Sequence, residues 1–122
     1  MNILAEYTEK QLEILSDIAK KCALELAMEL NSDVIDTFNY SGNLTDDEDS
    51  KRYVACALTT MGAIDTEGKN QGRKFIDDFS EGHDIEVLTK IVQKCSMVDG
   101  DTIEDRGYNF YKCFWTENLF GK

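Results

Sequence analysis

Apolar residues recur at every third or fourth position along most of the chain, which is the spacing of one face of an α-helix. The clearest example lies near the start, where Thr8 followed by Gln11 forms a capping box. Its apolar positions are Leu12, Leu15, Ala19, Cys22 and Leu26. This pattern predicts one long amphipathic helix with a break near residues 31–32.

Two further helices are expected before the middle of the chain. Ser32 can cap a short helix that carries Val34, Ile35 and Phe38. The polar, acidic segment 39–50 predicts a loop, and its last acids suit the positive N-terminus of a third helix that ends at Gly62. The apolar positions of this third helix are Tyr53, Val54, Ala57, Leu58 and Met61.

The second half of the chain predicts three more helices, separated by turns. Segments 64–72, 80–84 and 98–101 contain glycine and polar residues, which favour turns. The first of these helices carries Phe75, Ile76 and Phe79. The second carries Ile85, Leu88, Ile91, Val92 and Cys95. The last carries Tyr108, Tyr111, Phe114 and Trp115, and Thr102 is expected to cap it. No segment alternates apolar and polar residues long enough for a strand, so we expect an all-α fold of about six helices.

Composition and charge narrow the class of protein. The chain has 122 residues, the usual size of one domain, and we expect a single domain over residues 1–122. Its net charge of −11 argues against nucleic-acid binding, which depends on Lys and Arg neutralising phosphates, and against docking on an anionic membrane. It contains no apolar run of about 18 residues that could insert stably into a membrane.

The start of the chain and its four cysteines bear on whether the protein is secreted. The start of the chain lacks the basic and apolar regions of a signal peptide, so the protein is either cytosolic or a mature chain behind an added Met1. No CxxC or CxxH motif is present, so we expect no metal site and no cofactor. Four widely spaced cysteines fit two disulfides and an oxidising compartment, with three pairings open. The sequons at Asn39 and Asn43 agree weakly with secretion.

Catalytic chemistry is poorly represented in the sequence. The lone histidine, His83, lies among glycine and acidic residues, where a solvated surface position is the usual interpretation. Acidic neighbours such as Asp77 and Asp78 point to different faces of a helix, so they do not form an acid–base dyad. We therefore expect a protein that is not an enzyme.

The cysteine spacing, taken with six helices, resembles that of the insect odorant-binding protein family (PBP/GOBP), in its four-cysteine "C-minus" branch. The chain is also similar to the helical haemolymph carrier proteins of beetles. The likeness covers about residues 8–115, including "TEKQLEIL", "CALTTMGAIDTEG" and "YNFYKCF". The family's second and fifth cysteines, which bond to each other, would fall at Arg52 and Glu104.

The resemblance implies specific bonds and a binding site. It selects the disulfides Cys22–Cys56 and Cys95–Cys113, which would hold the helices around a closed apolar cavity for one hydrophobic molecule. Thr59, if it faced inward, would offer a hydroxyl anchor to the ligand's polar end. The residues that the resemblance places near the ligand are Leu15, Phe38, Val54, Leu58, Thr59, Ile64, Phe75, Phe79, Leu88, Val92 and Phe114.

The resemblance also implies a function. We expect a secreted carrier of an odorant, pheromone, fatty acid or similar small hydrophobic molecule in sensillar lymph or haemolymph. A weak homodimer and an unidentified receptor stay open as partners. The alternative is a secreted structural or signalling helical protein with a solid core and no ligand, because apolar residues on amphipathic helices most often form an ordinary core.

Overall fold

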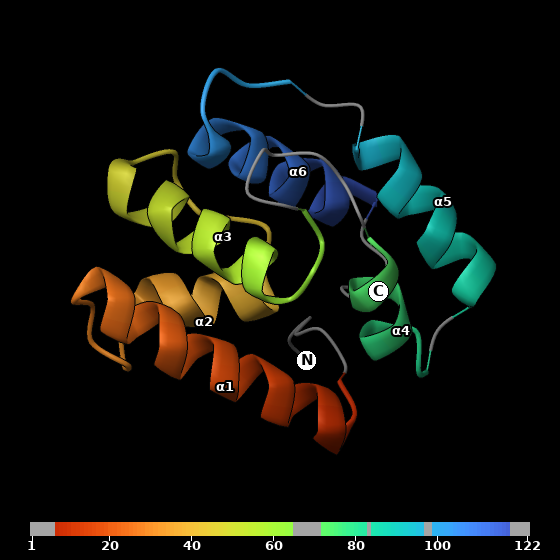
Figure 1. Cartoon of the computed structure of the whole chain (residues 1–122), viewed down its shortest axis with the longest axis horizontal. Helices are drawn as coiled ribbons and strands as arrows, with labels where there is room; N and C mark the ends of the chain where they lie inside the picture. The colour runs from red at the N-terminus through yellow and green to blue at the C-terminus, as the bar shows by residue number, and fades with distance from the viewer. Residues whose placement is uncertain (1–6, 65–71, 83, 97–98, 118–122) are drawn as a thin grey trace.

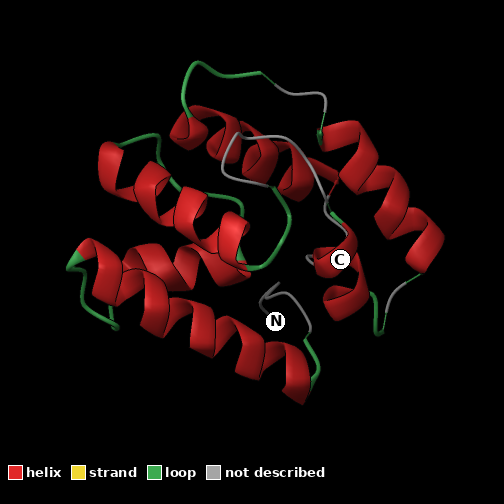
Figure 2. Ribbon diagram, viewed as in Figure 1, coloured by secondary structure: helices red, strands yellow, loops and turns green. Residues whose placement is uncertain are grey.

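The computed structural model describes residues 7–64, 72–82, 84–96 and 99–117. Within these ranges the protein folds into six α-helices and no β-sheet (Figure 1, Figure 2). The helices are α1 (Glu9–Leu26), α2 (Asp33–Tyr40), α3 (Glu48–Thr60), α4 (Arg73–Phe79), α5 (Ile85–Cys95) and α6 (Ile103–Glu117). The prediction of an all-α fold with about six helices is confirmed.

The first helix begins where the sequence predicts and ends earlier. The backbone N–H of Gln11 donates to Thr8 Oγ1 (3.1 Å), and the backbone N–H of Thr8 donates to Gln11 Oε1 (3.0 Å). The capping box is therefore present. The break near residues 31–32 was predicted too late in the chain, because α1 stops at Leu26. Ala27 adopts a left-handed conformation (φ 54°), and the Met28 N–H then closes the helix end on the carbonyl of Ala23.

Polar residues cap most of the other helices. Ser32, Asp47 and Asp84 each accept a hydrogen bond from a backbone N–H in the first turn of α2, α3 and α5, respectively. Thr102 does the same for α6, as predicted. The predicted loop 39–50 is shorter than expected, because α2 continues to Tyr40 and α3 already begins at Glu48. The acidic residues at its end are the first turn of α3, where the helix dipole favours negative charge.

Helix α3 lies between α6 on one side and α1 and α2 on the other, and packs against all three (Figure 1). Helix α6 in turn packs against α5, and α4 packs against α5. The α3–α6 contact is close because Gly107 is buried in it. A Cβ at that position would stand 3.4 Å from the Ala55 Cα and 3.5 Å from the Ile64 Cδ1, already in van der Waals contact.

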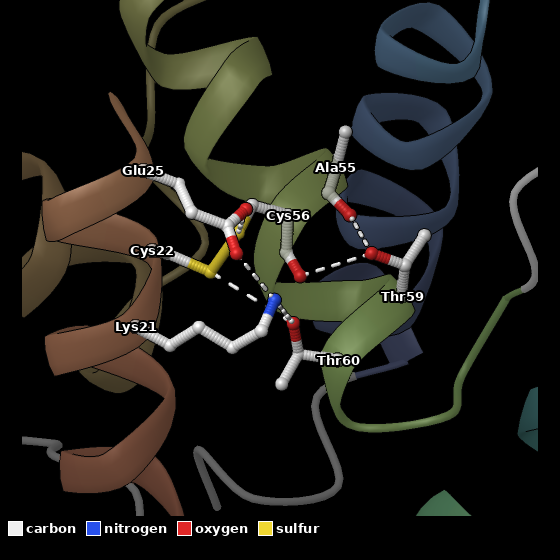
Figure 3. The surroundings of a disulfide bond; sticks show 7 residues. All are labelled: Lys21, Cys22, Glu25, Ala55, Cys56, Thr59 and Thr60. Carbon is white, nitrogen blue, oxygen red and sulfur yellow. Dashed lines mark hydrogen bonds and ion pairs between the residues drawn. A yellow bond between two sulfur atoms is a disulfide. The ribbon is translucent and has the colours of Figure 1, made fainter. Parts of the chain in front are cut away.

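Two disulfides join neighbouring helices. Cys22–Cys56 links α1 to α3 with Cα atoms 5.9 Å apart, and Cys95–Cys113 links α5 to α6 at 5.5 Å. The pairing implied by the family resemblance is thus confirmed. Figure 3 shows the first bond between the two helices, beside Lys21 and Glu25 of α1. In the chain-entropy model, loops of these lengths are each worth roughly 3–4 kcal/mol.

The positions of the two missing cysteines carry charges that do not meet. Arg52 pairs with Glu48 on its own helix, with 2.7 Å between Nη2 and Oε2, and among the described residues it forms no ion pair with Glu104. The two helices are instead linked by neighbouring residues, one position before Arg52 on α3 and one position after Glu104 on α6. There the Lys51 Nζ lies 2.8 Å from Asp105 Oδ1, and this contact holds the pKa of the Asp105 carboxyl below its ordinary value.

Candidate ligand-binding cavity

An internal cavity lies where five helices converge. Its wall takes side chains from α1, α2, α3, α4 and α6, from Tyr7 two positions before α1, and from Met61 directly after α3. All of them are apolar or aromatic: Tyr7, Leu15, Phe38, Leu58, Met61, Phe75, Phe79, Phe110, Tyr111, Phe114 and Trp115. An apolar, concave wall of this kind is typical of sites for small hydrophobic ligands.

Helical spacing brings the aromatic rings of α4 and α6 together. Phe75 and Phe79 are four residues apart on α4, with ring centroids 5.2 Å apart. Phe110 and Phe114 have the same spacing on α6 and lie nearly parallel, with centroids 6.3 Å apart. Phe75 meets Phe114 edge to face at 5.5 Å, so the two helices close one side of the cavity through their rings.

Another part of the wall is formed by Phe38 of α2. Its ring stacks on Tyr111 of α6 at 5.5 Å between centroids and meets Tyr53 of α3 edge to face at 5.4 Å. Phe38 and Tyr111 belong to the cavity wall, whereas Tyr53 lies outside that wall and is fully buried.

The hydroxyl groups in the wall are occupied by backbone partners. The Tyr7 hydroxyl donates to the carbonyl of Asn39. The Tyr111 hydroxyl donates to the Ser41 carbonyl (2.7 Å) and accepts from the Leu44 N–H (3.3 Å). Burial raises the pKa of Tyr111 to about 12 and that of Tyr7 further, so both phenols stay neutral. The wall therefore offers a ligand mainly apolar contacts.

The cavity is small in this structure. Its volume is about 40 Å³. Sites that enclose a drug-sized ligand measure roughly 300–1,000 Å³, so a ligand of that size can enter only if the wall side chains move apart. Most of the wall consists of aromatic rings, which would have to shift, and the unbranched Met61 is its most adaptable side chain.

The structure places just over half of the residues expected near the ligand in this wall. They are Leu15, Phe38, Leu58, Phe75, Phe79 and Phe114. Val54, Ile64 and Leu88 are buried elsewhere in the core, and Val92 is buried beside a groove between α4 and α5. A direct role of these four residues in binding stays a prediction.

Thr59 lies away from the cavity. It borders an outer groove with Leu26 and Ile103, and its hydroxyl donates to the carbonyls of Ala55 (2.9 Å) and Cys56 (3.1 Å), as Figure 3 shows. The hydroxyl therefore satisfies its own helix, which is common for threonine in a helix interior. The expected inward-facing anchor at Thr59 does not match this geometry.

Sequence reasoning missed several wall residues: Tyr7, Met61, Phe110, Tyr111 and Trp115. For α6 a signal existed, because Phe110–Phe114 and Tyr111–Trp115 are two pairs at a spacing of four residues. Tyr7 precedes the first periodic segment, and nothing in the pattern of apolar residues indicates that it folds back onto the core.

Other kinds of site find no support in the described part of the chain. No group of three or more potential metal-ligating side chains gathers there. None of the described helices is both long and apolar enough to cross a membrane. His83 lies outside the described residues.

Comparison with known proteins agrees with this geometry. The sequence profile of the PBP/GOBP family matches residues 4–117, which is nearly the whole chain. Among curated proteins, none matches the chain. The match extends across all six helices and both disulfides, and the chain therefore belongs to the PBP/GOBP family.

Proposed function

We propose that the protein is a secreted carrier that holds one small hydrophobic molecule in the cavity between its helices. PBP/GOBP proteins are small carriers of odorants and similar ligands, and they are binding proteins rather than enzymes. The observation that carries the proposal is the wall of apolar and aromatic side chains inside a fold of this family. The ligand would be an odorant, pheromone, fatty acid or similar molecule in sensillar lymph or haemolymph.

The cysteines support placing the chain in the C-minus branch, near the beetle haemolymph carriers. All four cysteines are bonded, and the two positions of the absent pair hold Arg52 and Glu104. A chain with these two disulfides would be suited to an oxidising extracellular fluid.

Binding would be driven by burial of apolar surface. Each 100 Å² of apolar ligand surface removed from water contributes about 2.5 kcal/mol before the costs of opening the wall. Because the cavity is small in this structure, part of this free energy is spent on moving its wall side chains apart.

Titration with a fluorescent apolar naphthylamine tests the proposal. We expect saturation at one site, and displacement of the probe by long-chain alcohols. A helical protein with a solid core, which is the alternative function, would give neither signal.

A matched pair of variants locates the site. Leu58→Trp fills the cavity and should weaken probe binding by about tenfold or more, a change of about 1.4 kcal/mol. Leu24→Trp adds the same ring at a position that is 83% exposed, and should leave binding unchanged. Thermal melting of both variants checks that the fold survives, because overpacking a core is itself destabilising. Equal affinities for both folded variants would place the probe elsewhere.

A further inference from the structure

One buried tyrosine differs from the others in its hydrogen bonding. The hydroxyl groups of Tyr7, Tyr108 and Tyr111 each donate to a backbone carbonyl. Tyr53 is 0% exposed, and its hydroxyl finds no hydrogen-bond partner among the described residues. A buried hydroxyl without a partner destabilises the protein, so it requires an explanation.

Tyr53 lies directly behind the wall of the cavity. Its ring meets the ring of Phe38 edge to face with 5.4 Å between centroids, and Phe38 is part of the wall. Phe38 belongs to α2, a helix of only eight residues. One aromatic side chain on a short helix is therefore in contact with both the cavity and the ring that carries the unpartnered hydroxyl.

The cavity must enlarge before it can hold a drug-sized ligand, because its volume in this structure is about 40 Å³. A movement of Phe38 away from Tyr53 would enlarge the cavity on this side. Because Phe38 contacts both the cavity and the Tyr53 ring, the same movement would give a ligand in the enlarged cavity access to that ring and its hydroxyl.

We propose that the Tyr53 hydroxyl donates a hydrogen bond to a single oxygen of the bound ligand, and that the ligand is a neutral oxygenated hydrocarbon such as a long-chain alcohol, aldehyde, ketone or ester. This inference rests on the proposed carrier function. It explains why a polar group is kept in the core without a partner, because the ligand itself supplies the acceptor.

Two observations favour a neutral ligand over a carboxylate. Among the described residues, the wall contains no lysine, arginine or histidine that could pair with a buried negative charge, and burying an unpaired charge is strongly unfavourable. The chain also carries a net charge of −11, which repels anions. Burial raises the pKa of Tyr53 to about 12, so the phenol keeps its proton and can donate.

The test compares ligands of equal chain length in wild type and in Tyr53→Phe. The ligands are an alkane, a primary alcohol, a methyl ketone and a carboxylate, each measured by displacement of the fluorescent probe. In wild type we expect the alcohol and ketone to bind about tenfold tighter than the alkane and the carboxylate to bind more weakly than the alcohol. In Tyr53→Phe the advantage of the alcohol and ketone should be lost, while the affinity for the alkane stays the same.

Two further measurements separate this role from a structural one. Ligand-free Tyr53→Phe should melt at a higher temperature than wild type, because the unpartnered hydroxyl is gone. The carbonyl stretch of the bound ketone should lie at lower frequency in wild type than in the variant. The matched control is Tyr108→Phe, because Tyr108 lies outside the cavity wall and its hydroxyl already donates to the Leu44 carbonyl (2.7 Å). That variant should melt at a lower temperature and keep the preference for oxygenated ligands.

The outcomes that overturn the inference are distinct from failure of the carrier function. If Tyr53→Phe binds the alcohol as tightly as wild type, or loses affinity equally for alcohol and alkane, Tyr53 is not the anchor although the protein is a carrier. A carboxylate that binds tighter than the alcohol would overturn the proposed ligand class. If wild type binds neither the probe nor any of the four ligands, the carrier function itself is wrong.

Discussion

Gln11 shows how one polar residue can stabilise the fold beyond its local role. Its side chain completes the capping box at the start of α1. It is also 1% exposed, and its Nε2 donates to the carbonyls of Asp78 (3.3 Å) and Glu81 (3.1 Å) at the end of α4. The sequence predicted the cap, because that signal is local. It could not predict the long-range contacts, which depend on where α4 packs.

Removing the Gln11 side chain should destabilise the fold more than its size alone suggests. We expect Gln11→Ala to lower the free energy of unfolding by about 2–4 kcal/mol, because buried backbone groups at both helix ends lose their partners. Urea denaturation followed by circular dichroism measures the change. Lys10→Ala, at an exposed neighbouring position, should change stability by no more than about 0.5 kcal/mol. Equal effects of the two substitutions would contradict the bridging role of Gln11.

At the scale of elements, the contact between α3 and α6 takes the place of a missing covalent bond. The two helices approach closely at Gly107, and the Lys51–Asp105 ion pair joins them beside the positions of the absent cysteines. A partly exposed ion pair of this kind restrains two helices much less than a disulfide does. We therefore expect α6 to move more freely against α3 than in relatives with three bonds, which would admit ligands of varied shape.

Restoring the third bond tests this interpretation. Arg52 and Glu104 border the same two surface grooves, so Arg52→Cys combined with Glu104→Cys should form a disulfide on oxidation. The bond should raise the melting temperature, since loop entropy alone predicts about 4 kcal/mol, and should slow ligand exchange. The serine double variant at the same positions is the control. Free thiols under oxidising conditions would show that the helices are placed differently from this structure.

At the scale of the whole molecule, the features that could be predicted from the sequence are those that depend on the spacing of residues along the chain. The 3.6-residue period predicted the helices, and the cysteine spacing implied both disulfides through the family resemblance. The early end of α1 was missed because it depends on a left-handed alanine, a conformation that alanine rarely adopts. The direction of Thr59 and the inclusion of Tyr7 in the cavity wall were missed because they follow from how the helices pack.

Ligand binding by the whole molecule should depend little on pH or on the last residues of the chain. Glu117 forms an ion pair with Lys94 at the surface (2.5 Å), and the residues after it carry a single apolar pair, Leu119 and Phe120, and no histidine. Deleting residues 117–122 should therefore change affinity by less than about fivefold.

The same reasoning predicts equal affinities at pH 5 and pH 7. The described cavity wall contains no group that titrates in this range. Tyr53 and Tyr111 keep their protons in the folded protein up to about pH 12, while in the unfolded chain they ionise near pH 10. Their ionisation therefore reduces stability only as the pH rises above about 10. Titrations of the full-length and the truncated protein with the fluorescent probe at pH 5 and pH 7 provide the check. A tenfold loss of affinity at pH 5 that disappears on truncation would show that the chain end controls release.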